Sequence, residues 1–133
     1  MHRTSTLPFN QQVKSFISKR RQLANLYTKE LSKTSLVLPK ENLNCKHVYH
    51  LYTVCHPQRE KIIKALKKNK IKINIYYPFP VHKMKGYQSK KIFDLKITNT
   101  VYKGIFSLPL YPELKFSEVK KITKILKEIL SKF

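Results

Sequence analysis

The sequence predicts an α+β fold, in which a small, mainly antiparallel sheet of about three strands is backed by helices. Two observations indicate this class. Apolar residues recur at helical spacing in three stretches of the chain, and three runs rich in β-branched and aromatic residues lie between those stretches. With 133 residues and 41% hydrophobic content, the chain has the size of one small domain, residues 1–133, with a modest core.

Three helices are expected. The first is a long amphipathic helix from about residue 10 to residue 33, interpreted as a linking helix ahead of an α+β unit of about residues 36–133. The second helix should begin near Pro57, since proline is tolerated in the first turn, and should end at Asn69 in the left-handed conformation. Ser117 is expected to cap the N-terminus of the third helix. Because the first helix has little of this chain to lie on, its apolar face should seek a partner.

Three strand-like runs lie between these helices: HVYHLYTVC, IKINIYY and YKGIFSLPL. The second run continues into IYYPFPVHKMKGY, residues 75–87, which we call the arm. Pro78 and Pro80 lack a backbone donor and favour extended geometry in the residue before them, so the arm should not be helical. Its tyrosines, histidine and lysines make it a candidate contact surface.

The net charge of +21 points to an anionic partner such as nucleic acid or a membrane surface. Only four of the 28 basic residues are arginine, however, and the 24 lysines are spread along the whole chain. Arginine is the preferred residue for bidentate contacts with phosphate and guanine. A solvated, lysine-rich surface is therefore favoured, and a nucleic-acid-binding module stays open as an alternative.

Cysteine and histidine residues gather in one part of the sequence, but no metal site is expected there. Cys45, His47, His50, Cys55 and His56 are types that bind zinc, yet they contain no paired CxxC or HxxxH motif. Hydrogen-bonded, partly buried histidines are favoured instead. On an extended strand the two cysteines would lie roughly 33 Å apart, which predicts free thiols.

Nothing in the sequence predicts a membrane protein. No apolar run approaches the roughly 20 residues of a membrane span. The first residues, MHRTSTLPF, lack the long apolar core of a secretory signal. A cytoplasmic location without a membrane partner is the expectation.

Five segments, in this order, resemble the C-terminal part of the DegT/StrS-type nucleotide-sugar aminotransferases, which are pyridoxal-phosphate enzymes of the aspartate-aminotransferase fold type I. They lie between about Phe16 and Leu130: FISKRRQLANLYTKEL, LVLP, HVYHLYTV, REKIIKALKKNKIKINIYYPFPVHKMKGY and SLPLYPELKFSEVKKITKILKEIL. The resemblance implies the small, C-terminal domain of that fold. It also implies a part in amino transfer to a keto-sugar nucleotide.

The same resemblance places the arm at the mouth of the active site. It implies substrate contacts by Tyr76, Tyr77, His82 and Lys83. Hydroxyl and imidazole groups can hydrogen-bond to sugar or phosphate oxygens, and a lysine can neutralise a diphosphate. Equally, the tyrosines and prolines could pack the arm onto a neighbouring domain.

The chain departs from the family pattern at two positions. Tyr76 stands where the family commonly has a histidine before the Tyr-Pro pair, which could alter a substrate contact. Lys70 replaces the glycine that usually ends the second helix, which would leave the termination of that helix to Asn69.

In this family the large domain supplies the Schiff-base lysine, the acid that pairs with the pyridine nitrogen and the phosphate site. No such segment precedes Phe16, so the large domain is expected to be absent. No catalytic or cofactor-binding residue is assigned to this chain, and pyridoxal phosphate is expected only with a complementing large domain. The expected partners are that large domain or a second copy, and a sugar nucleotide. A non-catalytic, degenerate remnant is the further alternative.

Overall fold

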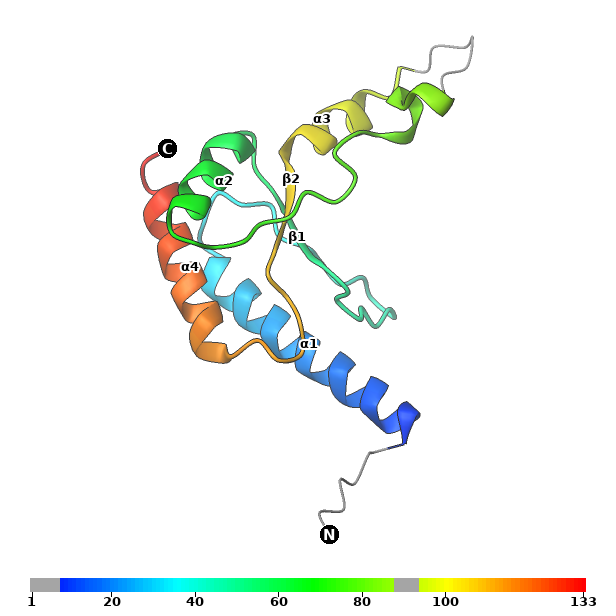
Figure 1. Ribbon diagram of the computed structural model, residues 1–133, viewed down its shortest axis with the longest axis vertical. Helices are drawn as coiled ribbons and strands as arrows, with labels where there is room; N and C mark the ends of the chain where they lie inside the picture. Colours follow the sequence, from blue (N-terminus) through cyan, green and yellow to red (C-terminus); the bar gives the residue numbers. More distant parts are fainter. Residues whose placement is uncertain (1–7, 88–93) are drawn as a thin grey trace.

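The computed structural model describes residues 8–87 and 94–133 (Figure 1). Over these residues it contains helices and a short sheet, which confirms the predicted α+β class. The elements are α1 (Phe9–Leu31), β1 (Tyr52–Cys55), α2 (Arg59–Lys68), η1 (Val81–Lys83), η2 (Lys85–Tyr87), α3 (Lys96–Gly104), β2 (Ile105–Leu108) and α4 (Phe116–Leu130). The first seven residues, which include most of the stretch weighed as a secretory signal, lie outside the described residues.

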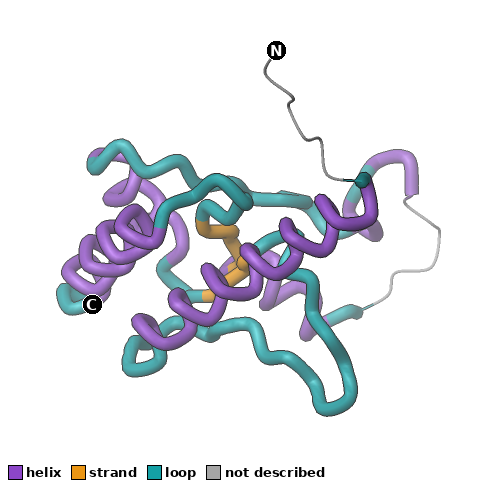
Figure 2. Tube along the Cα trace, turned by 90° about the horizontal axis from the view of Figure 1, so that it is seen from below, coloured by secondary structure: helices purple, strands orange, loops and turns teal. Residues whose placement is uncertain are grey.

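The core lies where three helices meet the sheet. The closing helix α4 packs against both α1 and α2, and Figure 2 shows α1 lying across the two strands. Tyr27 of α1 is fully buried, and its hydroxyl donates a hydrogen bond of 2.9 Å to the Pro109 carbonyl. Burial raises the pKa of this phenol, because the charged form is poorly solvated there. Other fully buried side chains are Leu23, Tyr52, Phe106, Leu126 and Val119.

Within the described residues, the sheet has two antiparallel strands, β1 and β2, with Tyr52 opposite Leu108. Each predicted strand run is longer than the strand observed. HVYHLYTVC pairs with β2 only from Tyr52, since Tyr49 has a φ of 49° and leaves the extended conformation. IKINIYY contributes a single bridge, from Asn74 to Ser107. The second of the three predicted strands is therefore reduced to one bridge beside β2.

Helix α3 is an element that the sequence analysis does not predict. The run YKGIFSLPL was interpreted wholly as a strand, but its first three residues form the end of α3, and β2 begins at Ile105. Ile97 and Val101 are four residues apart, which is helical spacing. These β-branched residues have low helix propensity, so composition favoured a strand.

Two predicted helix ends differ in detail. Ser117 is not the cap of α4, because the helix starts at Phe116 and Lys115 is the N-cap. The Glu118 carboxylate instead accepts a hydrogen bond of 2.8 Å from the Lys115 backbone N–H. At the end of α2, Asn69 has a φ of −87°, and it is Lys70 that takes the left-handed conformation, with a φ of 59°.

The two halves of α1 differ in burial. The expectation that this helix has little of its own chain to lie on is wrong for its second half, where Leu23, Tyr27 and Leu31 are fully buried. Phe9, Val13 and Phe16, in the first half, are exposed. Of the helices that the structure describes, none is long and apolar enough to cross a membrane.

Candidate functional site

The arm leaves the core at the edge of β2 and runs to α3. Tyr77 has a φ of 60°, which is rare for an aromatic residue and turns the chain ahead of the prolines. From Pro80 the backbone tightens into η1, where the Lys83 N–H donates to the Pro80 carbonyl at 2.9 Å. The expected extended arm is therefore extended only in its first part and ends in two short 3-10 turns.

Side chains of η1 contact α3. Nε2 of His82 lies 3.1 Å from the Asn99 Oδ1, so the imidazole is held by the helix. Nζ of Lys83 lies 3.4 Å from the Tyr102 hydroxyl and 4.9 Å from the centre of that ring. These two contacts fix the arm against α3 and set the directions of a histidine and a lysine.

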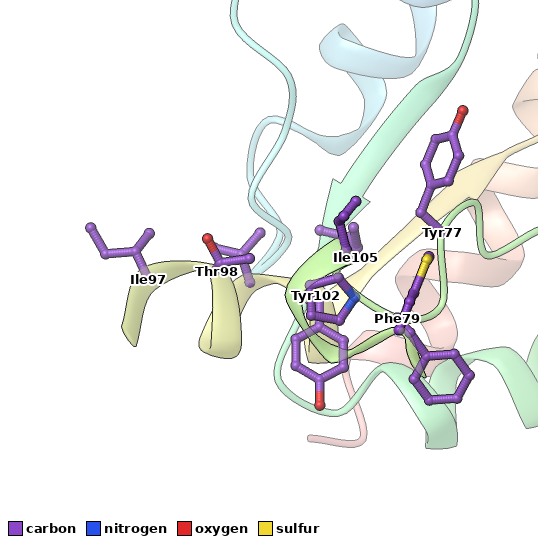
Figure 3. A pocket seen from close by; sticks show the side chains of 10 residues that line it. Tyr77, Phe79, Ile97, Thr98, Tyr102 and Ile105 are labelled. Atoms are coloured by element: carbon purple, nitrogen blue, oxygen red, sulfur yellow. The ribbon is translucent and has the colours of Figure 1, made fainter. Parts of the chain in front are cut away.

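Between the arm and α3 lies an open groove of about 350 Å³, shown in Figure 3. Tyr77 and Phe79 project from the arm, and Tyr102 and Ile105 approach from the other side. The lining is almost entirely apolar. It offers faces for stacking but little that could form hydrogen bonds with a ligand.

The four residues implicated by the resemblance do not form one cluster. His82 and Lys83 belong to η1 and both contact α3. Tyr77 borders the groove and is 79% exposed. Tyr76 is set apart, since its hydroxyl accepts a hydrogen bond of 3.2 Å from the Asn74 side-chain amide and it does not line the groove.

Sequence reasoning missed the residues of α3 that complete this region. Asn99 and Tyr102 orient the histidine and the lysine of the arm, yet both fell in a stretch without a predicted helix. The apolar spacing of Ile97, Val101 and Ile105 is the signal that could have revealed the helix.

In the part of the chain that the structure describes, no three potential metal ligands come together. The buried His56 confirms the expectation of a hydrogen-bonded histidine, because its Nε2 lies 3.1 Å from the Ser35 hydroxyl and its Nδ1 accepts from the Gln58 N–H. Cys45 and Cys55 are free thiols, as predicted.

The groove beside the arm does not fit pyridoxal phosphate. A cofactor site of this class needs a cation or clustered N–H groups for the phosphate and an acid for the pyridine nitrogen. The lining residues are apolar or aromatic apart from Thr98, and they include neither a lysine nor a carboxylate. The lining of this groove therefore does not supply the groups that the cofactor needs.

Comparison with known proteins identifies the family. The model of the DegT/DnrJ/EryC1/StrS aminotransferase family matches residues 11–127, and the chain belongs to that family. This match covers α1, the core, the arm and most of α4. It favours the aminotransferase interpretation of the sequence over the nucleic-acid-binding alternative.

Several curated relatives carry the names of sugar-nucleotide transaminases. The dTDP-3-amino-3,4,6-trideoxy-alpha-D-glucose transaminase of Micromonospora megalomicea is 32% identical over 88% of this chain and 33% of its own length. The UDP-N-acetyl-3-dehydro-alpha-D-glucosamine 3-aminotransferase of Acidithiobacillus ferrooxidans is 28% identical over 84% of this chain and 30% of its own. The chain thus spans about a third of the length of these relatives.

Solved structures agree with this fold. DesV of S. venezuelae superposes with a TM-score of 0.81 at 24% identity, over 86% of this chain and 32% of that one. The protein ntda of Bacillus subtilis, solved with bound cofactor pmp, gives a TM-score of 0.77 at 25% identity, over 87% of this chain and 28% of that one. The chain therefore has the fold of one part of these larger proteins.

Proposed function

We propose that this chain supplies the small domain of a pyridoxal-phosphate-dependent sugar-nucleotide aminotransferase, and that a complementing large domain completes the enzyme. The observation that carries the proposal is the family match over residues 11–127, which includes the arm. The dTDP- and UDP-linked sugars in the relatives' names support a sugar nucleotide as the substrate. When bound, the cofactor carries an amino group from a donor to a keto sugar.

The proposed role of the arm follows from the donors and acceptors that it presents. If Nε2 of His82 donates to Asn99, Nδ1 of the neutral ring is an acceptor and can bind a sugar hydroxyl. The Tyr76 hydroxyl accepts from Asn74 and keeps its own hydrogen for a phosphate oxygen. The Tyr77 hydroxyl can hydrogen-bond in the same way, and Lys83 supplies a positive charge near the diphosphate.

The first half of α1 is the proposed contact with the large domain. Phe9, Val13 and Phe16 are exposed, although the second half of the same helix is buried in the core. Exposed apolar side chains that lie together on one surface are typical of an interface. The alternative partner for this surface is a second copy of the chain.

Reconstitution tests the proposal. The chain is co-expressed with, or fused to, the large domain of the Micromonospora relative, and the large domain alone serves as the control. We expect amino transfer from glutamate to a keto-sugar nucleotide only when both parts are present, and cofactor retention after desalting whenever the large domain is present. The chain alone should show neither property, because a lysine without the surrounding cofactor site forms only loose imines.

Two results would contradict the proposal. If the 133 residues alone retained one cofactor per chain, the cofactor site would lie in this chain and not in the large domain. A chain that binds the large domain but never restores transfer, whichever family member supplies that domain, would favour the degenerate remnant.

A further inference from the structure

A second groove, of about 500 Å³, lies between α1 and the loop of residues 41–48. One wall is a single face of α1, where polar side chains recur every three or four residues. The opposite wall is formed by Lys46 and Val48. The side chains on the helical wall are Lys14, Ile17, Ser18, Arg21, Gln22 and Asn25.

The loop that forms the second wall is fixed to α1 by a charged clamp. Arg21 makes two hydrogen bonds to the Glu41 carboxylate, of 2.6 and 3.0 Å, and a third to the His47 carbonyl. The His47 N–H donates to the same carboxylate. Next to the clamp, Tyr49 is buried and its ring stacks on Tyr52, with the ring centres 6.3 Å apart. The groove is therefore formed before any ligand binds.

The charge of the groove is positive and comes from opposite walls. Arg21 and Glu41 neutralise each other, so the clamp adds little net charge. Lys14 and Lys46 have no carboxylate partner within residues 8–87 and 94–133. The Ser18 hydroxyl and the side-chain amides of Gln22 and Asn25 line the same groove and add hydrogen-bond donors to it.

We propose that this groove binds a diphosphate group, with Lys14 and Lys46 contacting it from opposite sides. Two cations, one from each wall, with neutral donors lining the same groove, match a ligand that carries two adjacent anionic groups. The arm lies at the other end of the molecule from the first half of α1 (Figure 1). The groove also shares no lining residue with the groove beside the arm, so it is a separate site, and its assignment does not depend on the proposed transaminase activity.

An NMR titration of the 133-residue chain with inorganic pyrophosphate, at physiological salt, tests the assignment. The changes in backbone amide chemical shift should be largest for residues 14–25 and 46–48. Replacing Lys14 and Lys46 together by alanine should weaken binding about tenfold. The matched control replaces Lys121 and Lys124, two exposed lysines of α4, which removes the same charge and should leave affinity within about twofold.

A second variant, Ser18→Glu, places a carboxylate inside the groove and should abolish binding. Melting temperatures confirm that each variant folds. Amide shifts spread over the lysines of the whole surface, or equal weakening by the two lysine pairs, would overturn the proposal, because non-specific attraction would then explain binding. A comparison of uridine diphosphate with pyrophosphate shows which kind of molecule carries the diphosphate. Tighter binding of uridine diphosphate indicates a nucleotide ligand. Equal binding indicates that the groove recognises the diphosphate alone.

Discussion

The core and the region of the arm with α3 both contain aromatic side chains, but these differ in what they contact. Tyr27 and Tyr52 are buried, their rings stack with centres 5.0 Å apart, and both hydroxyls are hydrogen-bonded. Tyr77 and Phe79 of the arm are 79% and 61% exposed. Similar residues thus stabilise the fold in one region and remain available for binding in the other. Substitutions in the core should therefore lower stability much more than substitutions in the arm.

The largest expected effect is that of Tyr27→Ala. The change removes a fully buried ring and leaves the Pro109 carbonyl without its partner, and we expect a loss of about 3–5 kcal/mol in the free energy of unfolding. Urea denaturation measures it. The control, Phe79→Ala in the arm, should change stability by less than about 0.5 kcal/mol. Equal losses would mean that the arm belongs to the core.

The next largest loss of stability is expected at Gly104, where the two regions join. Gly104 joins α3 to β2, and a Cβ at this position would lie 2.7 Å from the Cys55 Sγ and 3.1 Å from the His56 carbonyl oxygen. Gly104→Ala should therefore cost about 1–3 kcal/mol in thermal or urea unfolding. Gly86→Ala in the arm meets nothing within 4 Å and should be neutral or slightly stabilising.

Combining Gly104→Ala with Cys55→Ala tests the cause of this loss. Removing the sulfur relieves the closer of the two contacts, so the double variant should be more stable than the sum of the single changes predicts. Strict additivity would show that the carbonyl contact, and not the sulfur, opposes the alanine.

The core was more predictable from the sequence than the arm and α3, for a physical reason. The apolar stripes of α1, α2 and α4 follow helical periodicity because each helix buries one face. The helix α3 buries only Gly104. Its apolar residues Ile97 and Val101 are exposed to the groove, so neither burial nor propensity marks the helix strongly.

Backbone conformation explains the remaining differences. Tyr49, Lys70 and Tyr77 have positive φ values, although nothing about these side chains favours that region. At Lys70 this conformation belongs to the turn that ends α2, and at Tyr49 and Tyr77 it interrupts two runs that the sequence predicts as strands. The candidate residues of the arm came from the family resemblance. Their contacts with Asn99 and Tyr102 became visible only in the structure.

A smaller effect, of opposite sign, is expected where α2 leads toward the arm. Lys70 has a φ of 59° at the position where a glycine commonly ends this helix, and the Ile71 N–H closes the turn onto the Leu66 carbonyl at 3.1 Å. Lys70→Gly should stabilise the fold by about 0.5–1 kcal/mol, because glycine adopts this conformation without strain. Lys64→Gly, at an exposed position in the middle of α2, should destabilise by about as much. Destabilisation by both would show that the strain at Lys70 is negligible.

The clamp between Arg21 and Glu41 should respond to pH. Hydrogen bonds from Arg21 and from the His47 N–H lower the pKa of Glu41 from 4.5 to about 2. Because the folded-state pKa is depressed, the contribution of Glu41 is complete above pH of about 4.5 and is lost as the pH falls toward 2. An NMR titration of the Glu41 carboxyl should follow this. In Arg21→Gln its pKa should rise toward the ordinary value, and an unchanged pKa would exclude the clamp as the cause.

The smallest effects on stability are expected in the arm itself. Tyr77→Phe removes an exposed hydroxyl, and His82→Ala removes a contact with Asn99 at the surface, so both variants should melt close to the parent chain. In the enzyme completed by a large domain, each should raise KM for the sugar nucleotide about tenfold, if a hydrogen bond to the substrate is lost. Tyr111→Phe, at an exposed tyrosine outside the arm, is the matched control and should change neither quantity. Unchanged kinetics together with a lowered melting temperature would instead mean that the arm packs onto the neighbouring domain and does not contact the substrate.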